Sequence, residues 1–398
     1  MNSAPGTWSP LLQGEAATEA LAAAEAIARD LASDPKTAPG PGLNQGQTGL
    51  ALFFAYLQRS LGQPEAGERA QHHLEQAVTE IAEQLAPAAG LFYGFAGVAW
   101  VTEHLSAEEI SAKEEDLNEE IDAALLSLLR QSPWRGEVDL LGGLVGWGVY
   151  ALERLPRPAA AAMLPLVIER LAECAEPGAH GLVWRDPHNP LRTPDPGMAH
   201  GAAGVIALLA RMLREGAAGP ETASLLVDAV EGVLALHSPD DEGDLAWCAG
   251  NAGLSIALLA ASRASGRDDW ERTARRLASA SAERYRDIGR ILDPALCHGT
   301  AGLSHLFHRL YRTTGDPALL EAARHWLERT LAQRQPDQGI GGYLCRGRQR
   351  DGRIGWIINP GFLGGAAGIG LALLAAATPV EPAWDRLLLL SGDARGSG

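Results

Sequence analysis

The chain has 398 residues, of which 46% are hydrophobic and 21% are charged, and its formal net charge of −16 argues against nucleic acid as the main partner. No segment reaches the roughly 18 apolar residues that a membrane span requires. The first residues lack the basic start and apolar core of a signal peptide, and four scattered cysteines make no disulfide framework. Together these features predict a soluble, cytoplasmic protein with reduced thiols.

Glycine is in excess, with 46 residues, and many of the glycines belong to a repeat. The pattern Gly-x-x-Gly followed by an apolar run occurs seven times, at successive offsets of 48, 49, 58, 49, 49 and 66 residues. The seven copies are Gly46–Gly49, Gly94–Gly97, Gly143–Gly146, Gly201–Gly204, Gly250–Gly253, Gly299–Gly302 and Gly365–Gly368.

The predicted elements alternate along the chain between two kinds of helix. Each copy opens a short helix that is apolar on nearly every side, such as LALFFAYL after Gly49, and a helix of this kind is buried. Longer amphipathic stretches lie between the copies and predict helices with one solvent-exposed face. The clearest of them are Glu15–Ser33, Ala66–Ala86, Leu117–Gln131 and Asp316–Gln333.

The strongly apolar helices favour a closed ring over an open solenoid, because a solenoid would leave one row of them half exposed. The sequence therefore predicts an all-α fold, an α/α toroid of seven helical hairpins with the glycine turns at one end. We expect a single domain over residues 1–398, with a repeat core of about 15–378 and a polar tail over 385–398.

Two intervals between copies are longer than the others. The first excess lies near Glu176–Pro196, which is rich in Pro, His and Trp. The second lies near Gln335–Asn359, where a Gly-containing turn between two β-prone runs predicts a hairpin. Both inserts are expected at the end of the toroid that carries the glycine turns, as walls of a pocket.

The residues just before each first glycine differ between copies, and copies five and six read W-C-A-G and L-C-H-G. Cys248 and Cys297 therefore hold equivalent positions, and His298 follows the second. In a closed ring these side chains would converge, and two thiolates with one imidazole form a catalytic zinc set with an open fourth position. The competing interpretation is that both cysteines are simply buried, as this residue type usually is.

Two further residues stand at the corresponding turns of earlier copies. His200, in P-G-M-A-H-G, could serve as a proton donor, or could be a turn histidine that bonds to the backbone. Asp139, in V-D-L-L-G-G, could orient a partner or cap the turn. Cys174 and Cys345 lie away from these turns, and structural or incidental roles are expected for them.

With these motifs in this order, the sequence resembles the lanthionine synthetase C-like family, the cyclases that form thioether rings in lanthipeptides. The resemblance covers about Gly42 to Leu374. It implies an α/α toroid and one zinc ion per chain, and it implies acid/base work for His200 and a site role for Asp139. The zinc ligands that it implies are Cys248, Cys297 and His298.

Two positions depart from the family pattern. Asp244 stands where Arg is common, and Ala249 stands where Tyr or His is common. If Asp139 normally pairs with that Arg, it lacks this partner here unless another basic residue takes its place. Arg346 and Arg348 in the second insert are candidates.

The resemblance implies a standalone zinc-dependent cyclase that acts on a dehydrated precursor peptide. A substrate Cys thiolate would add to dehydroalanine or dehydrobutyrine, and a separate dehydratase would supply those residues. Three alternatives stay open: addition of glutathione to dehydrated residues, an inactive peptide-binding scaffold, and a prenyltransferase-like α/α barrel. The last does not predict seven glycine turns.

Overall fold

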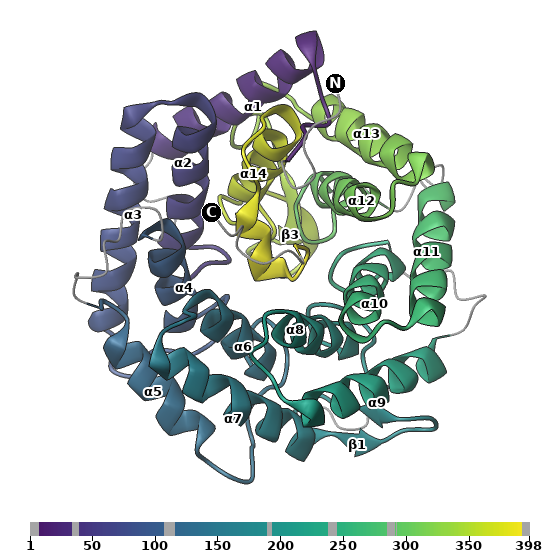
Figure 1. Ribbon diagram of the computed structural model, residues 1–398. Coiled ribbons are helices and arrows are strands. Elements are labelled where there is room, and N and C mark those ends of the chain that lie inside the picture. The colour runs from purple at the N-terminus through teal and green to yellow at the C-terminus, as the bar shows by residue number, and fades with distance from the viewer. Residues whose placement is uncertain are drawn as a thin grey trace. The chain divides into compact units, whose positions relative to one another are not determined.

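The computed structural model describes residues 8–33, 40–106, 116–188, 193–237, 245–284, 291 and 293–391. Within these residues fourteen α-helices alternate along the chain between an odd-numbered and an even-numbered set (Figure 1). The strongest contacts between consecutive helices join an even-numbered helix to the odd-numbered one that follows it, as in α2 with α3 and α12 with α13. The odd-numbered helices are α1 (Gly14–Ser33), α3 (Pro64–Ala82), α5 (Glu119–Leu129), α7 (Pro158–Cys174), α9 (Pro220–Leu236), α11 (Asp268–Glu283) and α13 (Pro317–Ala332). The even-numbered helices are α2 (Gln47–Leu61), α4 (Phe95–Ser106), α6 (Leu144–Glu153), α8 (Ala202–Arg214), α10 (Asn251–Ser265), α12 (Thr300–Thr314) and α14 (Ala366–Ala377).

Every even-numbered helix begins at the residue after the first glycine of a repeat copy. The second glycine lies in the first turn of the helix, close to the preceding loop: a Cβ at Gly49 would lie 2.4 Å from the carbonyl oxygen of Leu43. Only glycine permits this approach. The helices that follow are largely buried, and in α6 all ten residues are buried.

The odd-numbered helices bury one face, as their pattern predicts. In α3 the buried residues are Ala66, Ala70 and Ala77. Among the four amphipathic stretches, this helix differs most from its predicted range of Ala66–Ala86. It begins at Pro64 and ends at Ala82. The proline at 87 disfavours helical backbone at the residue before it. None of the described helices is long and apolar enough to cross a membrane.

The chain divides into two compact units. Unit 1 comprises Met1–Ala86 and Ser279–Trp384, and unit 2 comprises Pro87–Ala278 and Asp385–Gly398. In unit 2, helices α4, α6, α8 and α10 pack side by side in chain order. The single domain over 1–398 stays a prediction.

Unit 1 joins the two ends of the repeat. Helix α14 packs on α12 and also on α1 and α2, so the last copy lies against the first (Figure 1). An open row of repeats would leave its last copy without such a neighbour. This contact agrees with the closure that the apolar helices predict.

Neighbouring glycine turns are joined by backbone hydrogen bonds at equivalent repeat positions. In unit 2 the N–H of Phe92 donates to Leu141 O at 2.9 Å, and the N–H of Ala199 donates to Cys248 O at 3.1 Å. In unit 1 the N–H of Cys297 donates to Leu363 O at 2.8 Å. Within each unit the turns of consecutive copies therefore lie together.

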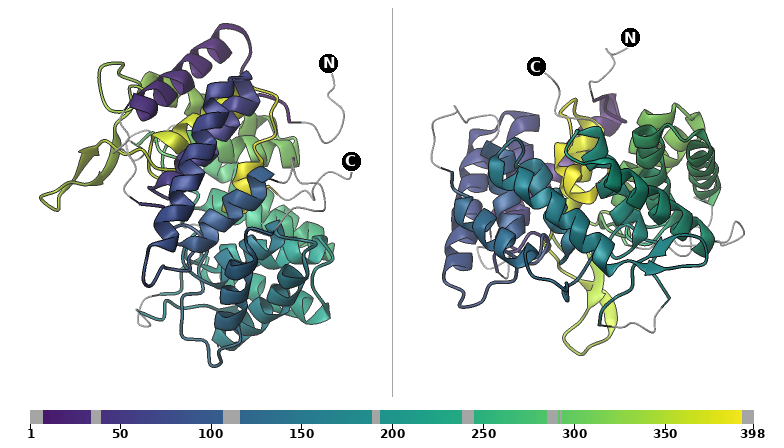
Figure 2. Two further views of the ribbon diagram at one scale, coloured as in Figure 1. Left: turned by 90° about the vertical axis from the view of Figure 1, so that its left-hand side faces the viewer. Right: turned by 60° about the horizontal axis from the view of Figure 1, so that its bottom comes forward.

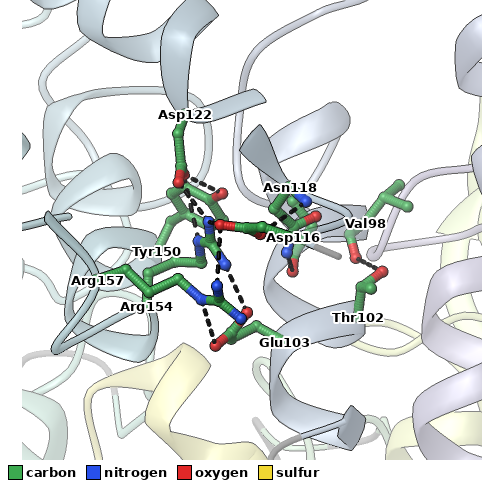
Figure 3. Close-up of polar contacts among 10 residues, drawn as sticks. Val98, Thr102, Glu103, Asp116, Asn118, Asp122, Tyr150, Arg154 and Arg157 are labelled. Carbon is green, nitrogen blue, oxygen red and sulfur yellow. Dashed lines mark hydrogen bonds and ion pairs between the residues drawn. The ribbon is translucent and has the colours of Figure 1, made fainter. Parts of the chain in front are cut away.

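A buried ion network ties α4, α5 and α6 of unit 2 together (Figure 3). The Arg154 side chain is fully buried, and it donates to Glu103 and Asp116 at 2.7 Å each. It also bonds to Asp122, which accepts from the Tyr150 hydroxyl at 2.6 Å. Buried charges need such partners, because an unpaired one loses its hydration without compensation.

Each of the two inserts contains a two-stranded antiparallel hairpin. In the first, β1 (Glu176–Pro177) pairs with β2 (Leu182–Val183), a hairpin that the sequence did not suggest because its strands are only two residues long. In the second, β3 (Cys345–Arg348) pairs with β4 (Ile354–Ile357), as its pattern predicts. Figure 2 shows the β3–β4 hairpin extending away from the helices of unit 1.

Candidate functional site

Unit 2 brings His200 and Asp139 together from the turns of two neighbouring copies. The Nδ1 of His200 lies 2.5 Å from Oδ2 of Asp139, and the other carboxylate oxygen accepts from the N–H of Gly142 at 2.8 Å. Asp139 therefore caps its own turn and also contacts the ring of His200, and its role in catalysis stays a prediction. Its hydrogen bond raises the pKa of the half-exposed His200 although partial burial opposes the shift.

Cys248 lies in the next turn along from His200. Its carbonyl oxygen accepts the N–H of Ala199, the residue just before His200, and the charge of Cys248 adds to the rise in the pKa of that histidine. The Cys248 side chain is partly exposed, and Ala249 beside it is exposed. In unit 2 the repeat register thus places one predicted zinc ligand next to the predicted proton donor.

A cavity of about 340 Å³ in unit 2 includes Asp139 and His200 in its wall. Trp184 from the first insert and Tyr93 from the turn of copy two supply aromatic surface to it. Glu137 lines the same cavity, and burial together with the nearby Asp139 raises the pKa of its carboxyl group. Glu137 was not predicted as a site residue, and its only signal in the sequence is its position two residues before Asp139.

Unit 1 holds the other two predicted zinc ligands, Cys297 and His298, in adjacent positions. The side chain of His298 is 46% exposed, and its Nε2 lies 3.5 Å from Oδ2 of Asp293, which is 4% exposed. The same oxygen of Asp293 accepts the N–H of Arg346 at 2.6 Å, so this carboxylate joins the hairpin insert to the turn of copy six. A carboxylate beside a histidine ring is a common way to orient a metal ligand.

In copies four, six and seven, the residue six positions before the first glycine stabilises the turn through its side chain, a pattern that was not predicted. Asp195, Asp293 and Asn359 each accept a hydrogen bond from the N–H two residues later, at 2.7 to 2.9 Å. Asp244 holds this same position in copy five, although it lies outside the described residues. The repeat itself could have revealed the pattern, since the first glycines of these copies are Gly201, Gly299, Gly365 and Gly250.

The three predicted zinc ligands are divided between the two units. Cys248 belongs to unit 2, whereas Cys297 and His298 belong to unit 1, and within the described residues no three His, Cys, Asp or Glu side chains form a metal-binding group. The zinc set therefore stays a prediction. The guanidinium of Arg348 donates to Gly352 O within its own hairpin. The expected pairing of Arg346 or Arg348 with Asp139 stays a prediction.

Comparisons with known proteins identify the fold and the family of the chain. The solved structure of nisin cyclase is similar over 92% of this chain and 96% of that chain, with a TM-score of 0.70 and 19% sequence identity. This similarity confirms the predicted all-α fold, the α/α toroid. No curated protein sequence matches the chain significantly. The family model described as lanthionine synthetase C-like protein matches residues 39–389, so the chain belongs to the lanthionine synthetase C-like family.

Proposed function

We propose that this protein is a zinc-dependent lanthipeptide cyclase. It joins Cys thiolates of a dehydrated precursor peptide to dehydroalanine or dehydrobutyrine residues of the same peptide, which gives lanthionine and methyllanthionine thioethers. Family membership supports this activity. The observation that carries it is the pairing of His200 with Asp139 at a cavity beside the turn of Cys248.

The residues present fit a zinc ion by their chemistry. Thiolate and imidazole are the ligands that zinc prefers, and Cys248, Cys297 and His298 would hold it. All three side chains are at least partly exposed, whereas Cys345 is buried. When bound, the metal would keep the substrate thiol as a reactive thiolate near neutral pH.

His200 is the proposed proton donor. Addition of the thiolate forms a C–S bond at the β-carbon and leaves an enolate, which takes a proton at the α-carbon. Because the Nδ1–H of His200 faces Asp139, Nε2 is the nitrogen that can donate. Asp139 stabilises the protonated ring before the transfer and fixes the tautomer after it. The half-exposed ring then regains its proton from water.

The substrate enters a site with aromatic walls. Tyr93 and Trp184 offer flat apolar surface at the cavity, and Asp186 and Glu137 add acidic groups. Such a wall suits a peptide chain, which presents both apolar and polar groups. The dehydrated residues that the reaction consumes must come from a dehydration of Ser and Thr, for which we propose a separate dehydratase as partner.

A second candidate function is the addition of glutathione to dehydrated residues. The exposed methyl group of Ala249 favours it, since this position offers no hydroxyl or imidazole to the substrate where the family commonly has Tyr or His. In this reaction the thiol comes from a separate molecule, so the product gains the mass of glutathione, whereas ring closure leaves the mass of the peptide unchanged.

Purified protein and one dehydrated peptide with a single Cys distinguish these functions. Free thiol is titrated with N-ethylmaleimide and products are identified by mass spectrometry, with and without glutathione. We expect ring closure without a change in mass, and we expect Cys297→Ala to lose both bound zinc and ring formation. Cys174→Ala, at the end of α7, is the matched control and should keep both. Ring closure at the full rate by zinc-free Cys297→Ala would refute the proposal.

A further inference from the structure

The β3–β4 hairpin has one anchored face and one open face. On the anchored face the side chain of Cys345 is 1% exposed. The backbone N–H of the next residue, Arg346, donates to the buried carboxylate of Asp293 and also holds the base of the hairpin. An isolated two-stranded hairpin is only marginally stable in water, so this base contact is needed to hold it. The hairpin then extends away from the other elements of unit 1 (Figure 2).

The open face combines arginines with large apolar side chains. The strand register pairs Arg346 with Trp356 and Arg348 with Ile354, and directly opposed residues project from the same face. Ile354 is 58% exposed, Trp356 47%, and Ile358, one residue beyond the strand, 63%. We name these five residues the hairpin face.

The positive charges of the hairpin face are not neutralised within the part of the chain that the structure describes. Arg353 near the turn pairs with Asp351 at 2.6 Å. Arg348 donates to a backbone oxygen, and no carboxylate among the described residues forms an ion pair with Arg346 or Arg348. On a chain of net charge −16, this is a local cationic surface that complements an acidic ligand.

The arrangement fits an extended peptide better than a lipid surface. The apolar side chains run along β4 at every second residue, whereas the turn that would enter a membrane first, Gln349–Arg353, is polar. An extended chain also alternates its side chains with a period of two, so it can match this row residue by residue.

We propose that the hairpin face binds an unreactive segment of the peptide substrate in which acidic and apolar residues alternate. This inference rests on the proposed function, because it names a second part of the same substrate. The acidic side chains pair with Arg346 and Arg348, and the apolar ones cover Ile354 and Trp356.

Fluorescence anisotropy with the full-length protein tests the proposal. The probe is a fluorescein-labelled synthetic peptide of alternating Glu and Leu that contains no Ser, Thr or Cys. We expect binding that sodium chloride weakens, and no binding of the same peptide with Lys in place of Glu. Trp356→Thr, which keeps a strand-forming residue, should weaken binding about tenfold or more.

Two arginine variants distinguish binding at the hairpin face from a general effect of positive charge. Arg346→Gln should weaken binding about two- to fivefold. Arg350→Gln makes the same charge change in the turn and should have no effect. Equal losses in these two variants, or full binding by Trp356→Thr, would overturn the proposal.

The remaining outcomes concern other ligands and the proposed function. Sedimentation of the protein with phosphatidylglycerol vesicles, without binding of the peptide, would assign the face to a membrane surface and overturn the proposal. Because the probe cannot form a ring, a failed cyclisation assay leaves a positive binding result standing. A failed binding assay likewise leaves the cyclase function standing.

Discussion

Replacing Asp139 with Asn tests the proposed proton donor directly. The carboxylate lies 2.5 Å from Nδ1 of His200, and its other oxygen accepts the N–H of Gly142. An Asn side chain that keeps the bond to Gly142 directs its NH₂ group at Nδ1, so a donor replaces an acceptor. The protonated imidazole then loses the partner that raises its pKa, and the neutral ring becomes the favoured form.

The expected loss follows from that one contact. A hydrogen bond to a charged group contributes about 1.5–3 kcal/mol, which corresponds to about a 10- to 150-fold fall in the rate of ring formation. The pH dependence has a definite sign. The raised pKa of His200 keeps the donor protonated to higher pH in the native protein, so Asp139→Asn should move the alkaline fall in rate to lower pH.

The assay measures loss of free thiol from a dehydrated peptide with one Cys, from acidic to alkaline pH. Asp195→Asn is the matched control, because Asp195 accepts the N–H of Gly197 at 2.7 Å and Asn359 already makes the same turn in copy seven. Asp195 also raises the pKa of His200 through its charge, whereas Asp139 adds a hydrogen bond to the ring, so this control should change the rate and the pH profile less than Asp139→Asn does. If Asp139→Asn keeps the rate and pH profile of the native protein, Asp139 only caps its turn and the proposed role of His200 is wrong.

Two further predictions concern stability and metal binding. Arg154→Met should lower the free energy of unfolding in urea by about 3–5 kcal/mol, because it leaves the buried carboxylate of Asp122 without its positively charged partner. Arg157→Met, whose side chain is 28% exposed, should lower it by less than about 1 kcal/mol, and equal losses would contradict the reasoning. Asp293→Asn should weaken zinc binding about 10- to 100-fold in competition with a chelator, because His298 loses the carboxylate that orients its ring. Unchanged zinc affinity in this variant would contradict that role for Asp293.

The helices and the glycine turns could be predicted from the sequence because their causes are local. The first glycine of each copy directly precedes a helix, and the second lies where a Cβ would meet the backbone of the preceding loop, as at Gly49 and Gly302. The apolar runs that follow cannot face water and must be buried. Cys248 and His200 stand at corresponding turns of consecutive copies, and a backbone hydrogen bond from Ala199 to Cys248 joins these two turns.

The sequence by itself determined the repeat, the fold class and the candidate site residues. Only the tertiary structure decided which side chains pair, because partners such as Asp139 and His200 are 61 residues apart and their contact depends on how neighbouring turns pack. The same holds for Asp293 beside His298, and for the open side of the hairpin, since burial of Cys345 leaves Trp356 to solvent. Local spacing determines helices and turns, whereas contacts between segments depend on the packing of the whole unit.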